Sequence, residues 1–227
     1  MNLLKKLILA SALYATLSSK AQVRFSFATD VSALRNFSPK QKFWAVGQTI
    51  QANFHLNKKE TFYAWLVYYS PGRFENVFRA YAIQPGTNPA SVAYRMKGLW
   101  KVKEFSLGLK HYFKGDFKRE TGWNLYGLAG LGLMFTDVKN TLNSPVDTSK
   151  YRLDAVPVEG IASFKRLTLD LGLGAEVPLG GDFFIYSDIK TFMQASSFPS
   201  PYLHRNKNVP LPLMANLGVR ILFGFSY

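Results

Sequence analysis

The C-terminal segment, residues 213–227, is the feature that most restricts the fold. Every second residue in it is apolar, while the intervening positions include Asn216 and Arg220. A period of two is typical of a β-strand with two different faces. Eight such positions exceed what a soluble core usually requires of one strand, whereas a strand that crosses a bilayer needs about 9 to 11 residues. The apolar series is Leu213, Ala215, Leu217, Val219, Ile221, Phe223, Phe225 and Tyr227.

The same alternation recurs along the chain, in segments 44–56, 105–113, 167–177 and 183–194. Segments 23–35, 61–69 and 123–136 bring the number of predicted strands to eight. Short connections (57–60, 115–122 and 178–182) alternate with mostly longer ones (36–43, 70–95, 137–160 and 195–210). Because backbone groups cannot remain unpaired in hydrocarbon, strands that cross a membrane must close into a ring. The sequence therefore predicts an all-β fold, a transmembrane antiparallel up-and-down β-barrel of eight strands.

The first 21 residues have the pattern of a cleavable signal peptide. Lys5 and Lys6 form a charged start, residues 7–17 are apolar, and Ser19-Lys20-Ala21 resembles a small-x-small cleavage site. The alternative, an uncleaved membrane anchor, requires a run of roughly 20 apolar residues, and this run is shorter. We therefore predict a signal peptide at 1–21 and one barrel domain at 22–227, located in the cell outer membrane of a Gram-negative bacterium.

Composition narrows the possible chemistry. The chain has no cysteine, which excludes disulfides, thiolate zinc sites, a cysteine nucleophile and a lipid-modified N-terminal cysteine. The formal net charge is +14, and removal of the three lysines of the signal leaves +11. The exported domain is therefore strongly basic, and an anionic partner is expected.

Two glycine-rich segments resemble a known family. Segment 125–133, Leu-Tyr-Gly-Leu-Ala-Gly-Leu-Gly-Leu, and segment 170–176, Asp-Leu-Gly-Leu-Gly-Ala-Glu, are similar to strands of small outer-membrane β-barrel domains of the OmpA, OmpX and OmpW types. The resemblance covers nearly all of the domain and implies eight strands without a periplasmic domain. It also implies that Phe223, Phe225 and Tyr227 form the signal for the barrel-assembly machinery. The family includes structural, adhesive, transport-accessory and enzymatic members, so activity stays open.

Alternation also predicts which charged residues face the barrel lumen. In an eight-stranded barrel, side chains fill the interior, and a buried charge without a partner is costly. One interpretation is a salt-bridged plug, and the other is a narrow conduit whose charges select a solute or ion. The predicted lumen charge network consists of Lys110, Asp170, Glu176, Asp188, Lys190 and Arg220.

The histidines give little support for catalysis. His55, His111 and His204 lack the spacing of metal ligands, and none lies in a recognisable nucleophile motif. We predict no catalytic residue, no metal and no cofactor. A lipid-modifying enzyme remains the third alternative, with His204 or His55 as its candidates, although His55 is more simply explained as a hydrogen-bonding residue of the lumen.

Basic residues gather in the predicted long loops. Phosphates of lipopolysaccharide pair directly with Lys and Arg, whereas export behind a signal argues against a nucleic-acid partner. The alternative is that the basic loops only solvate the protein. We therefore predict a non-enzymatic barrel with a structural, binding or envelope-interaction role, whose loops contact lipopolysaccharide or an envelope protein within outer-membrane lipid. A narrow conduit for small solutes is the alternative. The predicted contact residues are Lys40, Lys42, Arg73, Arg95, Lys97, Arg205 and Lys207.

Overall fold

The computed structural model describes residues 24–153, 157–194, 202–203 and 212–224, and their regular structure consists of β-strands. None of these residues belongs to a helix long and apolar enough to cross a membrane. The predicted signal peptide, 1–21, lies outside the described residues. The strands are β1 (Arg24–Asn36), β2 (Phe43–His55), β3 (Glu60–Tyr69), β4 (Gly72–Ala82), β5 (Ser91–Lys114), β6 (Asn124–Leu142), β7 (Tyr151–Arg152), β8 (Gly160–Gly180), β9 (Phe183–Gln194) and β10 (Leu213–Phe223).

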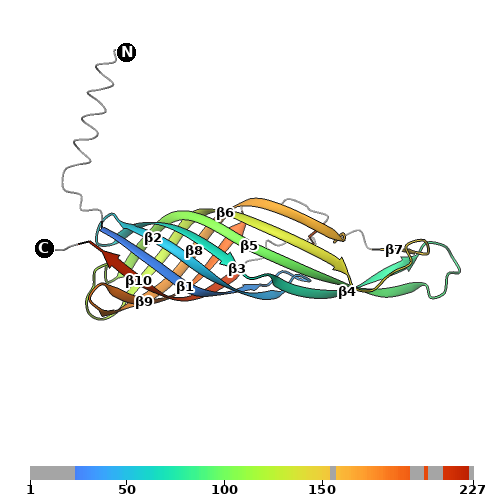
Figure 1. Cartoon of the computed structure of the whole chain (residues 1–227), viewed down its shortest axis with the longest axis horizontal. Coiled ribbons are helices and arrows are strands. Elements are labelled where there is room, and N and C mark those ends of the chain that lie inside the picture. Colours follow the sequence, from blue (N-terminus) through green and yellow to red (C-terminus); the bar gives the residue numbers. More distant parts are fainter. Residues whose placement is uncertain (1–23, 154–156, 195–201, 204–211, 225–227) are drawn as a thin grey trace, which may run out of the picture.

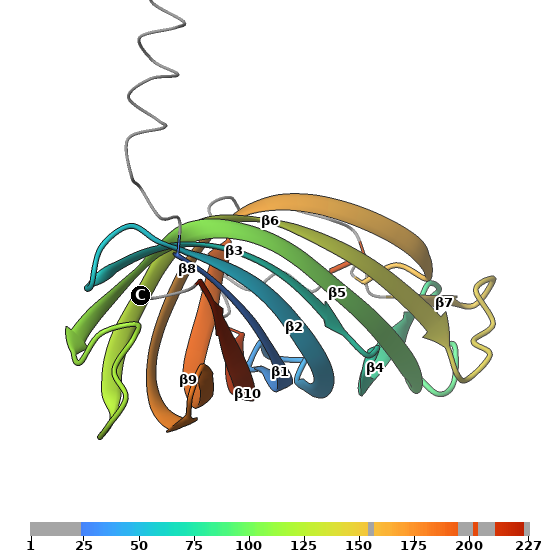
Figure 2. The same ribbon diagram turned by 60° about the vertical axis from the view of Figure 1, so that its left-hand side comes forward.

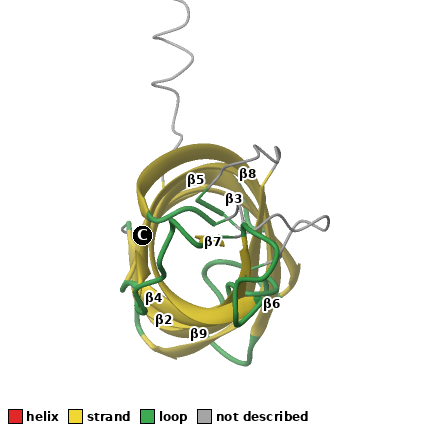
Figure 3. Ribbon diagram, turned by 90° about the vertical axis from the view of Figure 1, so that its right-hand side faces the viewer, coloured by secondary structure: helices red, strands yellow, loops and turns green. Residues whose placement is uncertain are grey.

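Eight strand positions close into a ring, visible end-on in Figure 3. Their order is β1, β2, β3, β5, β6, β8, β9 and β10, each antiparallel to the next. Pairing of β10 with β1, from Phe223 opposite Phe25 to Leu213 opposite Arg35, closes the barrel. The predicted eight-stranded antiparallel barrel is therefore confirmed.

β4 continues β3 along the same partner strand. β3 pairs with β5 up to Tyr68, opposite Lys103, and β4 resumes the pairing at Gly72, opposite Trp100. The gap between these two pairs is one residue longer on the β3–β4 side than on β5. Pro71 lies in this interruption, where its missing N–H breaks no ladder bond. Gly72 is required there because a Cβ would overlap the ring of Phe43.

The structure corrects the prediction of a long loop at 70–95. This segment is a β-hairpin of β4 and the first part of β5, and its connection covers only residues 83–90. Arg73 and Arg79 on β4 face outward, while Phe78 and Ala80 are buried. The alternation continues here, but the outward face carries Arg73, Glu75 and Arg79 beside Val77 and Tyr81. A search for apolar outward faces therefore missed the strand.

The barrel wall is uneven in height. β5, β6 and β8 have 24, 19 and 21 residues, whereas β1, β2, β9 and β10 have 13, 13, 12 and 11. We call β4, β5, β6 and β8 the tall wall, and the four shorter strands the short wall. The tall wall rises at the end opposite the short turns, as Figures 1 and 2 show. These two ends are named the loop end and the turn end.

The outer surface carries an apolar belt. Leu131, Leu173 and Leu217 lie on three different strands and expose 69%, 63% and 63% of their surface. Residues one position away face the interior and are polar or glycine. In water such exposure is costly, whereas hydrocarbon favours it. The belt is therefore the bilayer-facing surface of a membrane-spanning barrel.

The four tryptophans divide between the two faces of the wall. Aromatic girdles are typical of the outer surface of such barrels, but Trp65 and Trp100 are 2% and 7% exposed and face the lumen. Trp44 and Trp123, which are 65% and 45% exposed, do face outward. Strand parity decides the difference, because Trp65 and Trp100 share their faces with buried Tyr63 and Val102.

Candidate functional site

Glu176 is the centre of a buried ion cluster near the turn end. Lys110 Nζ donates to Glu176 Oε2 at 3.1 Å, and Arg220 Nη2 donates to Oε1 at 2.8 Å. Asn124 Nδ2 also donates to Oε1, at 3.0 Å. These groups come from β5, β6, β8 and β10, and all are at most 3% exposed. The cluster ties four strands together across the lumen.

Aromatic rings enclose this cluster. The Arg220 guanidinium lies 3.9 Å from the ring centre of Phe184, and Lys110 Nζ lies 3.6 Å from that of Tyr126. Such contacts stabilise cations that have lost water. Phe117, in the connection between β5 and β6, accepts a hydrogen bond from Arg220 through its carbonyl oxygen at 2.9 Å. The connection therefore folds inward over the cluster.

An open cleft of about 480 Å³ lies at the turn end, below this cluster. Its lining includes the charged Lys118, Glu120 and Asp182 and two apolar side chains, Phe184 and Leu222. These last two side chains are only 2% and 6% exposed and belong to the packed aromatic cluster. The cleft thus ends against packed side chains.

A second ion pair lies in the middle of the lumen. Lys190 Nζ lies 3.3 Å from Asp188 Oδ2, and the ammonium is 4.3 Å from the ring centre of Trp65. Asp188 also accepts hydrogen bonds from Tyr126 Oη at 3.1 Å and Asn216 Nδ2 at 2.5 Å. All five side chains are buried.

Two buried carboxylates that the sequence analysis missed complete the central layer. Asp30 accepts hydrogen bonds from Tyr186 Oη at 2.8 Å and from the Thr49 backbone N–H at 3.2 Å. Glu104 accepts from Thr168 Oγ1 at 2.6 Å. Glu104 shares the inward face with Lys110, so strand parity would have found it. It was missed because the predicted strand began only at residue 105.

The six predicted lumen charges are all buried, but they do not form one network. Lys110, Glu176 and Arg220 form the turn-end cluster, and Asp188 with Lys190 forms the central pair. Asp170 has no cation within salt-bridge distance among the described residues, and it accepts a short hydrogen bond from Ser106 Oγ.

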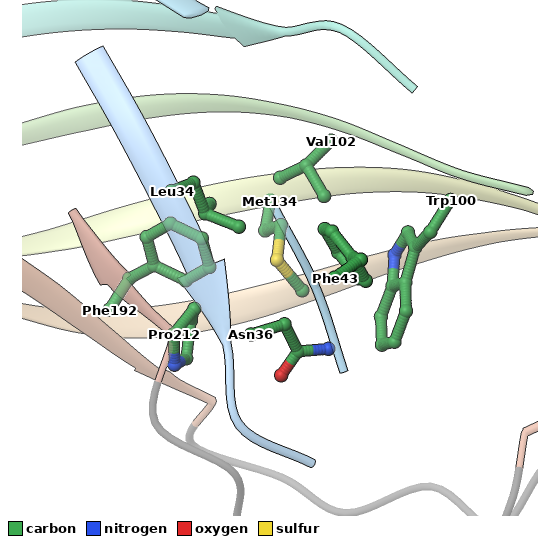
Figure 4. A pocket seen from close by; sticks show the side chains of 8 residues that line it. All are labelled: Leu34, Asn36, Phe43, Trp100, Val102, Met134, Phe192 and Pro212. Atoms are coloured by element: carbon green, nitrogen blue, oxygen red, sulfur yellow. The ribbon is translucent and has the colours of Figure 1, made fainter. Parts of the chain in front are cut away.

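At the loop end, the lumen is filled by apolar side chains. Its buried cluster includes Leu34, Phe43, Val102, Met134 and Phe192. A small cavity of about 20 Å³ remains among them, with room for about one water molecule. Figure 4 shows its lining side chains pointing toward one another from several strands. Packed apolar side chains, instead of paired ions, close this half of the lumen.

The histidines do not form a catalytic arrangement in the described residues. Both ring nitrogens of His55 are engaged, Nε2 with Ser26 Oγ at 2.9 Å and Nδ1 with Thr61 Oγ1 at 2.8 Å. His111 Nδ1 lies 2.5 Å from Glu60 Oε1 on the outer surface. His204 lies outside the described residues.

The predicted basic contact residues occupy strands more than loops. Arg73 lies on β4, while Arg95 and Lys97 lie on β5, which corrects their assignment to a loop. Lys40 and Lys42 do lie in the connection between β1 and β2. The two remaining residues, Arg205 and Lys207, fall outside the described residues.

The outward face of the tall wall is basic at the loop end. It carries two acids, Glu75 and Asp137. Arg95 lies within salt-bridge distance of Glu75, at 3.8 Å. The outward face of the short wall carries a single charged side chain, Arg35. At the loop end, the exposed cations of the tall wall are Arg73, Arg79, Arg95, Lys97, Lys101, Lys103, Lys139 and Lys165.

The C-terminal aromatic signal is described in part. Phe223 faces outward, is 49% exposed and stacks on Phe25 of β1 with ring centres 5.9 Å apart. Phe225 and Tyr227 lie outside the described residues.

This closed ring, apolar belt and filled lumen define a small transmembrane β-barrel, with the fold of the eight-stranded barrels of the Gram-negative outer membrane. Among solved structures, it is similar to Neisserial surface protein A, with a TM-score of 0.53, 13% identity and coverage of 88% of this chain and 97% of that one. It is also similar to the outer membrane protein OprG from Pseudomonas aeruginosa, with a TM-score of 0.50, 12% identity and coverage of 89% of this chain and 97% of that one. No protein-family model matches the sequence, and no curated protein matches it.

Proposed function

We propose that the protein is a non-enzymatic, non-conducting outer-membrane barrel that binds outer-leaflet lipopolysaccharide along its tall wall. The observation that carries the proposal is the contrast between the outward faces of the two walls: eight exposed cations at the loop end of the tall wall and Arg35 alone on the short wall. A barrel that needed charge only for solubility has no reason to collect it on one side. A one-sided basic surface beside a bilayer suits an anionic lipid head group.

Lys103 and Lys165 are the best placed of these cations. They flank Phe135 in one cross-strand row, with Lys103 paired to Phe135 and Phe135 to Lys165. Toward the turn end, the next outward residues of these strands, Phe105 and Leu167, are apolar and exposed. The row therefore lies where the apolar belt meets the charged surface. That level suits phosphates at the boundary of the outer leaflet, which ammonium groups bind as point charges.

Binding of purified lipopolysaccharide to the refolded barrel in detergent tests this proposal. At about 1 kcal/mol for each cation near an anionic surface, the double variant Lys103→Ala/Lys165→Ala should bind about thirtyfold more weakly. Lys58→Ala/Lys114→Ala, which removes two exposed lysines near the turn end, is the matched control and should bind normally. Equal affinity of both variants would contradict the tall-wall site, and dephosphorylated lipopolysaccharide binding as tightly as the intact form would contradict phosphate recognition.

The filled lumen supports the non-conducting part of the proposal. Ion pairs close the turn-end half and apolar side chains close the loop-end half, and an interior of this size is filled by side chains. In planar bilayers, the refolded protein should therefore give no stable single-channel current. Stable currents that disappear on changing Lys190 or Arg220 would instead establish the conduit.

A further inference from the structure

The side chains of Glu104 and Asp170 meet over β6, whose inward residues at this level are glycines. β6 lies between β5, which carries Glu104, and β8, which carries Asp170. Its inward positions at this level are Gly130 and Gly132, and Gly132 pairs with Ser106 on one side and Thr168 on the other. The missing side chains leave room over β6 for groups from both neighbours.

Oxygen atoms converge in this space. A Cβ built on Gly132 would lie 2.8 Å from Glu104 Oε1 and 2.7 Å from Asp170 Oδ2, with Thr168 Oγ1 nearer still. The glycine-rich run of β6 therefore creates a compact cluster of hard oxygen donors from two strands.

The charges of this cluster are not balanced by the described residues. Glu104 and Asp170 are each 0% exposed, and neither has a Lys or Arg of the described residues within salt-bridge distance. The nearest buried ammonium, that of Lys190, lies against Asp188. Two adjacent carboxylates cannot both stay ionised in a buried site without compensation, because burial and mutual repulsion both oppose it.

Three oxygens beside the cluster have no hydrogen-bond partner in the described part of the chain: Glu104 Oε2, Asp170 Oδ1 and Tyr63 Oη. Tyr63 comes from a third strand, β3, and its side chain is fully buried. Its hydroxyl would lie 2.5 Å from a Cβ built on Gly108 and 2.4 Å from one built on Gly130. Buried polar atoms are nearly always paired, so unpaired ones from separate strands that point to one place indicate a missing ligand.

We propose that Glu104 and Asp170 bind a hard divalent cation of the Ca²⁺ class in the middle of the lumen, with the Tyr63 hydroxyl as an additional oxygen ligand. Carboxylate and other oxygen donors are the ligands that such ions prefer. One divalent ion balances both carboxylates and gives the unpaired oxygens a partner. It also links β3, β5 and β8 at the level between the turn-end ion cluster and the apolar loop-end half.

Terbium luminescence tests this site, since an aromatic ring such as that of Tyr63 sensitises a bound Tb³⁺ ion. The full barrel, refolded in detergent free of lipopolysaccharide, is loaded with Tb³⁺ during refolding because packed layers lie on both sides of the site. We expect about one Tb³⁺ per chain, displaced by Ca²⁺. Glu104→Gln and Asp170→Asn should each weaken binding at least tenfold, as loss of even outer-shell groups costs 10- to 100-fold, and Tyr63→Phe should weaken it less.

Asp30→Asn is the matched control, because Asp30 is another buried lumen carboxylate that has no cation of the described part of the chain within salt-bridge distance but has its own donors, Tyr186 and Thr49. It should bind Tb³⁺ like the unmodified protein, and heat-modifiable migration on gels confirms that each variant is folded. Absence of saturable binding in the unmodified protein would overturn the proposal and indicate a carboxyl pair that shares a proton. Equal binding by the folded Glu104→Gln variant would overturn it too, by placing the ion elsewhere.

Discussion

The two halves of the lumen are closed by different interactions, buried ion pairs at the turn end and apolar packing at the loop end. In the turn-end half, Glu176 receives hydrogen bonds from Lys110, Arg220 and Asn124 among aromatic rings. In the loop-end half, a buried apolar cluster fills the same cross-section, with no buried ion pair among its members. Paired ions depend on every partner being present, whereas apolar packing loses stability in proportion to the volume removed. The same barrel should therefore respond abruptly to mutation in one half and gradually in the other.

The sharpest test of this contrast is Glu176→Gln. The substitution preserves shape but leaves Lys110 and Arg220 buried with no compensating charge. Loss of one member of a buried ion pair costs about 3 to 5 kcal/mol, so we expect a fall in unfolding free energy of about 4 kcal/mol. Urea unfolding in lipid vesicles, followed by tryptophan fluorescence, measures it. The exposed Glu75→Gln should change little, and a loss below about 1 kcal/mol for Glu176→Gln would mean that the cluster is not essential for stability.

In the loop-end half, Met134→Ala enlarges the existing cavity. Truncation of a buried Met costs about 2 to 5 kcal/mol, and we expect about 3 kcal/mol here. The same unfolding measurement applies. Leu131→Ala on the neighbouring outward face of β6 is the control, because Leu131 is 69% exposed and leaves no internal cavity. If both variants lose the same stability, the loop-end half is not packed as a core.

The contrast between the halves also shows what the sequence could predict. β9 has the predicted bounds, 183–194, because Phe183, Ile185 and Ile189 mark its outward face while Asp188 and Lys190 mark its inward face. β4 was missed because Arg73 and Arg79 occupy the positions that hold leucines elsewhere. Period-two alternation fixes which face a residue occupies, but it does not tell whether the opposite face meets lipid or water. That distinction depends on how far the strand rises above the bilayer.

Side-chain partners were harder to predict than faces. Parity places Glu176 and Arg220 inside, but their contact depends on the stagger between β8 and β10, which are separated by β9. Glu104 was missed because the predicted strand began only at residue 105, and Lys101 and Lys103, just before it, face outward. The glycines at 130 and 132 were noticed only as a family resemblance. Their physical role is the space that they leave between β5 and β8.

In the central layer, removal of a single hydrogen bond to a buried carboxylate shows whether the loss of stability there is as large as in either half of the lumen. Tyr186→Phe removes the hydroxyl that donates to Asp30 at 2.8 Å and keeps the ring. Hydrogen bonds to charged groups contribute about 1.5 to 3 kcal/mol, and we expect about 1.5 kcal/mol because the Thr49 N–H still donates. Tyr68→Phe, on the exposed face of β3, is the matched control. A loss equal to that of Glu176→Gln would extend the abrupt response to the central layer.

The smallest effect is expected where the same ionic chemistry lies outside the wall. Arg95 and Glu75 are 3.8 Å apart, and their side chains are 63% and 40% exposed. Exposed pairs typically contribute about 0.2 to 1 kcal/mol, so a double-mutant cycle with Arg95→Gln and Glu75→Gln should give a coupling of about 0.5 kcal/mol or less. The coupling should weaken further in high salt, because exposed charges are screened. A coupling as large as the effect of Glu176→Gln would show that burial does not cause the abrupt response, since this pair has the charges of the lumen cluster without its burial.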